Sequence, residues 1–345
     1  MSDKKKMGFF QKTKNMTDTN LLLAITMIVF FAMYIGAMIF EGKGFLKAQT
    51  FLNMLNANAA LIIASCGMSI VMITGSIDIS VGGVAALVSM CCAVYLDYHG
   101  GNVVTAIFIS LGIGLLFGLV QGYLVAYLDI QPFIVSLAGM FFARGMTTIV
   151  NTEPFNVQNE AFVKLKETRV IVPGLGSVNK LGKYVNAYVE IGVVVALILV
   201  IVLFCMLRWS KSGRNFYAVG GNQQSALMLG INVKKTKFMA HLLCSLLAGI
   251  GGFVYFMHVG SGSASHATGM EMNAIASSII GGTMLTGGVG NIIGTLFGVL
   301  SLSTIQNIVS SAGLDQAWWT GITIAAMLCL FLVIQSVVLA RKKRK

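Results

Sequence analysis

The sequence predicts an all-α, polytopic integral membrane protein, and three observations support this fold class. Hydrophobic residues make up 56% of the 345 residues and charged residues only 10%, whereas soluble proteins carry about 25% charged residues. The apolar segments are about 20 residues long, which suits helices that cross a bilayer and does not suit the short alternating segments of membrane barrels. The basic residues gather beside these apolar segments.

Ten apolar segments are candidate transmembrane helices, which predicts about 10 spans in a single transmembrane domain, residues 20–340. In chain order the segments are 20–40, 57–75, 81–97, 102–127, 132–150, 188–208, 236–258, 272–290, 292–312 and 318–340. Because an even number of spans places both termini on one side of the membrane, the basic segments 1–19 and 341–345 are expected to lie together.

Three clusters of basic residues orient these spans. They lie in 1–19, in 208–237 and in 341–345, which the count of spans places on one side. Lys and Arg are enriched in cytoplasmic segments, so we expect cytoplasmic termini, a cytoplasmic loop at 209–235 and a long outside loop at 151–186. The clusters account for the net charge of +12 as anchors to the lipid bilayer and not as a nucleic-acid surface.

Two further segments are predicted on the outside. Residues 41–56 have helical spacing and could form a short helix along the membrane surface. Residues 259–271 are rich in small polar side chains. We therefore expect both segments to connect spans without entering the bilayer.

The residues that could carry enzyme chemistry are scattered. The four histidines are not neighbours, and the six cysteines fall within apolar segments, where we expect small buried residues and no disulfides. The chain contains no HExxH, GxSxG, CxxC or phosphate-binding GxxxxGK[ST] pattern. The sequence therefore predicts no catalytic residue, no metal site, no cofactor and no ATPase activity of its own.

A break rich in small residues, "MITGSIDISVGG" (72–83), separates the second and third apolar segments and contains Asp78. A carboxylate is costly in lipid, so Asp78 must face a partner or water. It could cap the following helix, helped by Ser80, or it could hydrogen-bond a substrate on a translocation path. The sequence leaves both roles open.

Glycines indicate close packing and a possible internal repeat. Residues 73–83 can be aligned with 280–290, "IGGTMLTGGVG", and both join two apolar segments. Related breaks in two halves of a chain are typical of many transporters. Two further sets of glycines are spaced by four residues and predict helix–helix contacts: Gly114, Gly118 and Gly122, and Gly294 and Gly298.

The cytoplasmic segment predicts a short helix at 223–229. Asn222 can cap its start, Gly230 can end it, and Gly220 and Gly221 are expected to break the chain before it. A capped helix between glycines on the cytoplasmic face suits docking of a partner protein, whereas the alternative is a surface loop.

Several of these stretches together resemble the permease subunits of ribose/galactose-type ABC sugar importers. They are "GSIDISVGG" (75–83), "YAVGGNQQSALMLGINVKKTKF" (217–238) and "MEMNAIASSIIGGTMLTGGVGNIIGTLFGVL" (270–300). The segments "PFIVSLAGMFFARG" (132–145) and "WWTGITIAAML" (318–328) are most similar to the galactofuranose-type branch. The chain departs from the family pattern at Ile79, where leucine is usual, and at Asn273, where aspartate is frequent.

The resemblance implies a subunit of a bacterial plasma (inner) membrane transporter that imports a galactofuranose-, galactose- or ribose-like monosaccharide. A second permease copy, or a paralogous permease, would complete the pore as a homodimer or heterodimer. A cytoplasmic ABC ATPase would bind ATP and Mg and hydrolyse the ATP, and an extracytoplasmic binding protein would deliver the sugar. The implied coupling residues are Gly220, Gly221, Asn222, Ser225, Ala226, Leu229, Gly230 and Ile231.

A sugar path needs uncharged hydrogen-bonding groups rather than charges. The uncharged candidates are Asn56, Asn58, Ser65, Ser69, Ser80, Ser277, Ser278, Thr283, Gln306 and Asn307, and the carboxylate of Asp78 is a separate candidate for contact with sugar hydroxyls. Each of them could instead make a hydrogen bond between helices. Glu271 and His266 could contact the binding protein, or Glu271 could favour the start of its helix, and Arg144 is expected to form a structural ion pair.

The rival class is an ion- or proton-coupled secondary sugar transporter. Such a protein needs a carboxylate within the membrane that titrates, and Asp78 is the one good candidate in the sequence. Dependence of uptake on ATP or on a proton gradient separates the two classes.

Overall fold

The computed structural model describes residues 18–41, 45, 47–178, 184–314 and 316–343. The predicted basic N-terminal cluster therefore lies outside the described residues. The long helices are α2 (Asp18–Glu41), α3 (Ala48–Ile73), α4 (Val81–Asp97), α5 (Val103–Ala126), α6 (Pro132–Val150), α8 (Ile191–Trp209), α11 (Val233–Val259), α13 (Ile292–Ser311) and α14 (Ala317–Lys343). The short ones are α7 (Glu160–Glu167), α9 (Lys211–Gly221), α10 (Gln223–Met228) and α12 (Met270–Ile280).

The all-α membrane class is confirmed. Within the described residues, eight helices are long and apolar enough to cross a membrane, and α4 matches the third predicted segment although it has only 17 residues. The prediction of one span at 272–290 is wrong, because α12 ends at Ile280 and 281–291 is a turn. Gly282 (φ 90°) and Gly287 (φ 85°) have left-handed backbone there, which ends a helix.

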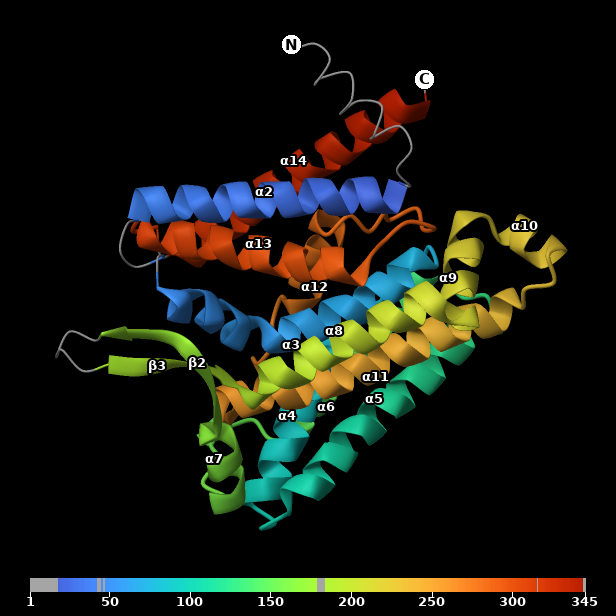
Figure 1. The fold of residues 1–345 in the computed structure, drawn as a ribbon. Helices are drawn as coiled ribbons and strands as arrows, with labels where there is room; N and C mark the ends of the chain where they lie inside the picture. Colours follow the sequence, from blue (N-terminus) through green and yellow to red (C-terminus); the bar gives the residue numbers. More distant parts are fainter. Residues whose placement is uncertain (1–17, 42–44, 46, 179–183, 315, 344–345) are drawn as a thin grey trace, which may run out of the picture.

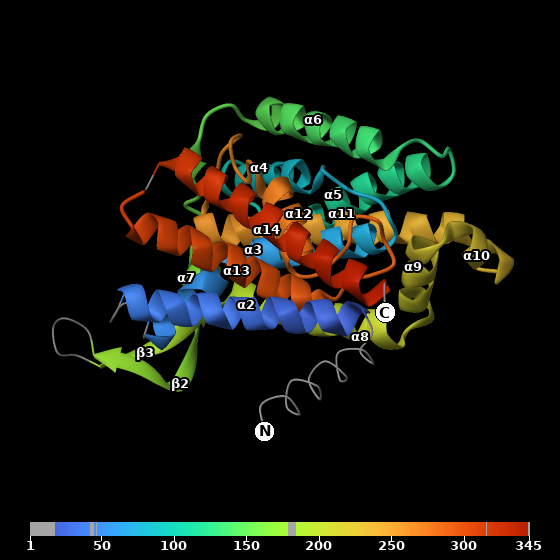
Figure 2. The same cartoon turned by 90° about the horizontal axis from the view of Figure 1, so that it is seen from above.

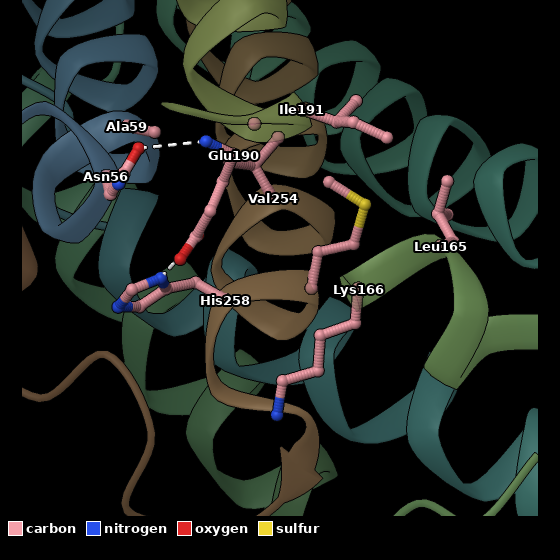
Figure 3. A pocket seen from close by; sticks show the side chains of 10 residues that line it. Asn56, Ala59, Leu165, Lys166, Glu190, Ile191, Val254 and His258 are labelled. Carbon is pink, nitrogen blue, oxygen red and sulfur yellow. Dashed lines mark hydrogen bonds and ion pairs between the residues drawn. The ribbon is translucent and has the colours of Figure 1, made fainter. Parts of the chain in front are cut away.

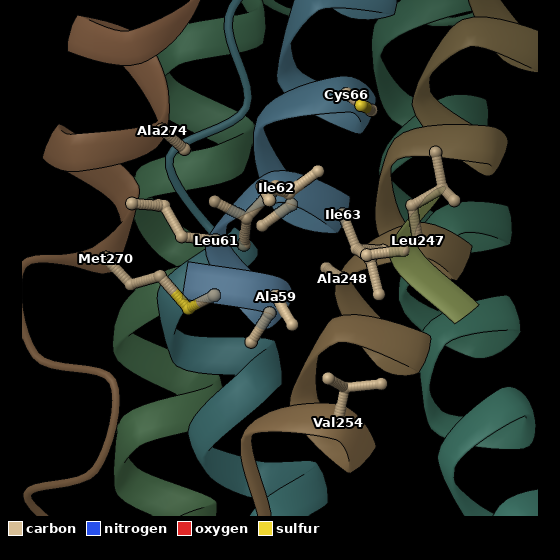
Figure 4. Packing of buried hydrophobic residues seen from close by; sticks show 14 of the residues in the cluster. Ala59, Leu61, Ile62, Ile63, Cys66, Leu247, Ala248, Val254, Met270 and Ala274 are labelled. Carbon is tan, nitrogen blue, oxygen red and sulfur yellow. The ribbon is translucent and has the colours of Figure 1, made fainter. Parts of the chain in front are cut away.

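The bundle is built around α3 and α11. Helix α11 packs against α5, α3 and α4, and α3 also contacts α12 and α13. Figure 4 shows α3 between α11 and α12, with Ile63 facing Leu247 and Leu61 beside Met270. Most of α3 is buried inside the bundle, whereas α14 exposes most of its surface, as expected of a helix that faces lipid.

Glycines allow the close helix contacts that their spacing predicts. A Cβ at Gly114 would lie 2.7 Å from the carbonyl oxygen of Ser245, and one at Gly118 would lie 2.9 Å from the Leu242 Cα, so α5 lies directly on α11. The cysteines are free, as predicted, but Cys329 on α14 is exposed and not buried.

The segments that the sequence places outside contain more regular secondary structure than predicted. The segment 151–186 is not a plain loop, because it holds β1 (Phe155–Asn156), α7 and most of a hairpin of β2 (Arg169–Val178) and β3 (Tyr184–Glu190). Strand β1 pairs with β4 (Ser261–Gly262). The separate surface helix expected within 41–56 is also wrong, since α3 begins at Ala48 and continues unbroken into the bundle.

The two ends of the bundle are distinct. In Figures 1 and 2 the β2–β3 hairpin projects from one end, and α9 and α10 project from the other. The start of α2 and the end of α14 lie at the same end as α9 and α10. The described basic clusters therefore share one end of the molecule, as the count of spans predicts.

Candidate functional site

The two glycine-rich breaks meet each other and the end of α9 in a cluster that we call the glycine junction: Ile73, Gly75, Gly220, Gly287 and Gly288. The Gly288 N–H donates to the Ile73 carbonyl at 2.8 Å. A Cβ at Gly220 would overlap that carbonyl oxygen and lie 2.6 Å from the Gly288 nitrogen. Backbone therefore touches backbone from three separate segments, which only glycine permits.

The segment after α9 forms the predicted capped helix. The Asn222 side chain accepts from the Ser225 N–H at 2.8 Å, and Gly230 has a left-handed backbone (φ 75°) after α10. The expected break at Gly220 and Gly221 is wrong, because both residues belong to α9. The chain leaves the helix at Asn222, which has extended backbone.

Helix α10 presents apolar side chains to solvent. Leu227, Met228 and Leu229 are 55%, 86% and 78% exposed. In contrast, Ala226 is buried with Val219 in a small cluster that holds α10 against α9. Of these three exposed residues, the sequence singled out only Leu229. The sequence signal that could have identified Leu227 and Met228 is a run of apolar residues at the end of a helix that is too short to bury them.

A cluster of hydroxyl groups around Ser69, which we call the hydroxyl seam, lies where α3, α12, the turn after α12 and α13 meet: Ser69, Ser278, Thr283 and Thr295. The Ser69 hydroxyl lies 2.9 Å from that of Ser278, 2.6 Å from that of Thr295 and 3.5 Å from that of Thr283. All four residues are fully buried. The seam is thus a buried polar cluster within an apolar core.

Some of the other path candidates lie near the hydroxyl seam and others lie away from it. Ser65 and Ser277 are buried near it, and their hydroxyls have no hydrogen-bond partner. Asn58 donates to Ser303 on α13 at 2.9 Å. Asn307 lies half-buried further along α13. Thr295 and Ser303 were missed, because single hydroxyl residues in apolar helices carry no distinguishing sequence signal.

Asp78 and Ser80 lie in a different polar cluster, between α4, α5 and α11. The Asp78 carboxylate accepts from the Ser80 N–H at 3.0 Å and from the Ser80 hydroxyl at 2.6 Å, and the Gln121 amide donates to that hydroxyl at 2.8 Å. Asp78 is fully buried, and these contacts shape the turn that starts α4. Ser80 is the N-cap residue of α4 and its side chain makes no capping bond, so these contacts lie in the turn before the helix. Asp78 is not part of the hydroxyl seam, and its choice between a structural role and sugar contact stays a prediction.

Toward the end of the bundle that carries the β2–β3 hairpin, α6 is tied to the segment before α12. The Arg144 guanidinium donates to the carbonyls of His266 at 2.5 Å and of Ala267 at 2.8 Å, and the Glu271 carboxylate is 4.0 Å away. Arg144 therefore has the expected structural role, mainly through carbonyls. Burial lowers the pKa of His266, whose ring contacts Ser89. Glu271 and His266 are both buried, so neither offers an open contact surface in this conformation.

Asn56 lies in a further polar cluster, shown in Figure 3. Its side chain accepts from the Glu190 N–H at 2.9 Å, and the Glu190 carboxylate meets His258 at 2.7 Å. The cavity beside them is about 10 Å³, room for about one water molecule. Asn56 thus fixes β3 to α3, away from the hydroxyl seam.

Comparison with known proteins matches this architecture to transport proteins. Residues 50–332 match the family described as branched-chain amino acid transport system / permease component. The chain is 35% identical to the inner membrane ABC transporter permease protein YjfF of Escherichia coli, over 93% of both chains. It is 34% identical to the fructose import permease FruG of Bifidobacterium longum (82% of this chain, 81% of the relative) and 32% identical to the ribose import permease RbsC of Escherichia coli (79% and 81%). No solved structure matches.

Proposed function

The chain belongs to this family of permease components, among the ABC sugar-import permeases of the bacterial inner membrane, and from that membership we propose that it forms the pore for a monosaccharide driven by ATP hydrolysis in a separate subunit. Its relatives include proteins named for import of fructose and ribose. A galactofuranose-, galactose- or ribose-like sugar is the proposed substrate.

The hydroxyl seam supports a sugar as the substrate. Its groups are uncharged and can both donate and accept hydrogen bonds, as sugar hydroxyls do. The seam groups now satisfy one another, while the Ser65 and Ser277 hydroxyls nearby have no partner. Parting α3 from α12 and α13 would expose this set to a passing sugar, and closing would restore the internal bonds.

The glycine junction supports a route from ATP hydrolysis to the seam, and it is the observation that carries the proposal. The partner ATPase docks on the exposed face of α10, at Met228 and Leu229. Its movement shifts α9, whose Gly220 presses on Ile73 and Gly288. Ile73 lies one helical turn after Ser69 on α3, and Gly288 lies in the turn that carries Thr283. A shift of α9 therefore changes the spacing across the seam.

The remaining partners follow the same orientation. The end with α9 and α10 is cytoplasmic, so both termini are cytoplasmic and the β2–β3 end faces the binding protein. A second permease, identical or paralogous, completes the pore. ATP and Mg are held by the ATPase subunit and not by this chain.

Uptake in sealed vesicles tests this function. We expect vesicles that contain this chain, its ATPase and its binding protein to take up sugar when ATP is inside, with no loss on addition of a proton uncoupler. Uptake that persists without ATP and stops with the uncoupler would instead establish the proton-coupled alternative. The Asp78→Asn variant adds a second readout, because it should remove proton coupling only in that alternative.

A further inference from the structure

A basic pocket opens at the same end of the bundle as α9. It is about 280 Å³ in volume and lies where the start of α2, the end of α8, α9 and the start of α13 meet. Figure 2 shows the start of α2 beside the end of α8. The pocket is separate from the glycine junction, the hydroxyl seam and the exposed face of α10.

Two guanidinium groups line this pocket, Arg208 from α8 and Arg214 from α9. Neither forms an ion pair with a carboxylate among the described residues. Arg214 donates to the Trp209 carbonyl at 3.1 Å, which uses one of its five N–H donors. Donors therefore remain for an anion, and guanidinium groups bind phosphate oxygens well because two parallel hydrogen bonds form.

The other walls also suit an anion. The 20-residue helix α13 starts here, capped by Asn291, and a helix start carries partial positive charge. Burial raises the pKa of Tyr217 to about 12, so its hydroxyl stays neutral, and that hydroxyl donates to the Gly290 carbonyl at 2.8 Å. No negative charge comes from these side chains.

The position of the pocket distinguishes a lipid from a soluble anion. One wall is apolar, formed by Phe204 and Leu207. The neighbouring Trp209 is 68% exposed at the end of α8, as expected at a membrane–water boundary. The acyl region of a phospholipid can contact the apolar wall, and its phosphate can bind the cationic groups next to that wall.

We propose that this pocket binds the phosphate of an anionic phospholipid headgroup, with Arg208 and Arg214 as its ligands. A bound lipid would join α2, α8, α9 and α13, and Tyr217 would link it to Gly290, in the turn that carries the glycine junction. A bound anionic lipid would then stabilise the arrangement in which α9 contacts this turn.

Thermal unfolding of the purified full chain tests the assignment. We expect phosphatidylglycerol, but not phosphatidylcholine, to raise the midpoint of unfolding. In the double variant Arg208→Gln/Arg214→Gln the half-maximal lipid concentration should rise by about tenfold or more, because each arginine beside anionic lipid contributes about fivefold in affinity. The matched control Lys234→Gln/Lys235→Gln removes the same charge from exposed residues at this end and should respond like the wild type.

Two outcomes would overturn the proposal. The first is an unchanged response of the arginine variant, or an equal loss in the lysine variant, which would mean a general effect of basic charge. The second is an equal midpoint shift from glycerol 3-phosphate or inorganic phosphate at the same concentration, which would assign the pocket to a free phosphate compound.

A second measurement does not depend on stability. With Trp318→Phe and Trp319→Phe, Trp209 is the sole tryptophan of the chain. In mixed bilayers, brominated phosphatidylglycerol should quench its fluorescence more than brominated phosphatidylcholine does at the same mole fraction. Addition of Arg208→Gln/Arg214→Gln should remove this difference. Equal quenching by both lipids in the unmodified pocket would contradict the proposal.

Discussion

At the scale of single residues, the packing of the bundle depends on glycines at positions where two backbones are in contact. Gly220 and Gly221 are adjacent in α9 but differ in their surroundings. A Cβ at Gly220 would overlap the Ile73 carbonyl oxygen, whereas one at Gly221 would have nothing within 4 Å. The absence of a Cβ is therefore required for packing at Gly220 and not at Gly221.

This difference predicts opposite effects of one methyl group. Gly220→Ala should lower the free energy of unfolding by about 1–3 kcal/mol, as overpacked contacts do, and should reduce uptake because α9 no longer rests on the junction. Gly221→Ala, the matched control, should preserve stability in the isolated chain. Equal stability of the two variants by thermal unfolding would contradict the close contact.

The lowered pKa of His266 leads us to expect that the stability of the fold depends on pH. Its ring is buried and lies 3.1 Å from the Ser89 hydroxyl, and burial lowers its pKa below 6.5. The unfolded chain therefore takes up a proton at higher pH than the folded chain does. Its contribution to stability is complete above pH 6.5 and is lost as the pH falls through the lowered pKa.

Thermal unfolding across this pH range provides the test. The drop in midpoint between about pH 7.5 and about pH 5.5, on either side of the usual His pKa, should be smaller in His266→Gln than in the wild type. His99→Gln, at an exposed histidine, should keep the wild-type drop. An identical drop in His266→Gln would exclude this residue as the cause.

Some residue roles could be predicted from sequence and others could not. Asn222 and Gly230 could, because a helix cap and a left-handed end depend on local chemistry. The contact of Gly220 with Ile73 and Gly288 could not, because it joins segments that are far apart in the chain. Thr295 is one hydroxyl among many in apolar helices, and only its distance to Ser69 reveals its place in the seam.

At the scale of elements, exposed α10 is the proposed docking site for the ATPase. Its apolar residues Met228 and Leu229 lie at the tip of a projection that is held by the buried Ala226. A six-residue helix has little stability of its own. Its order comes from the cap at Asn222 and from the packing of Ala226 against α9, which makes it a stiff contact for a partner.

A charge on this surface should weaken docking and leave the fold intact. We expect Met228→Asp and Leu229→Asp to reduce co-purification of the ATPase and to abolish uptake, with unchanged unfolding midpoints. Leu175→Asp, at an exposed apolar residue on the hairpin at the other end, is the control and should retain the ATPase. Full co-purification with both α10 variants would show that the ATPase docks elsewhere.

The prediction of helices succeeded where apolar length and helix ends agree. The bounds of α4 and α6 coincide with the predicted segments. The segment 272–290 failed, because its apolar residues continue past Ile280 while the backbone at Gly282 and Gly287 cannot remain helical. The prediction for segment 41–56 was wrong because its polar side chains belong to the first turns of α3, which continues into the bundle.

At the scale of the whole molecule, the proposed function requires a movement at the end with α9 and α10 to change the spacing of residues in the middle of the bundle. The contacts run from α10 through α9 and the glycine junction to the hydroxyl seam. Helices α9 and α10 are neighbours in the chain, whereas the junction and the seam each join segments distant in sequence. The resemblance to sugar permeases could be recognised from the motifs that form these contacts. The arrangement itself could not, because no local pattern records which helices lie side by side.

The exposure of Ser69 during transport tests most directly whether the hydroxyl seam is the sugar path. Ser69 is fully buried, and so is Ser110 on α5, which lies outside the seam. In a chain whose six native cysteines are replaced, Ser69→Cys should react with a water-soluble maleimide only while the assembled transporter hydrolyses ATP with sugar present, and Ser110→Cys should stay unreactive. Addition of Gly220→Ala should slow the labelling of Ser69→Cys. A Ser69→Cys transporter that takes up sugar while that cysteine stays unreactive would contradict the seam as the path.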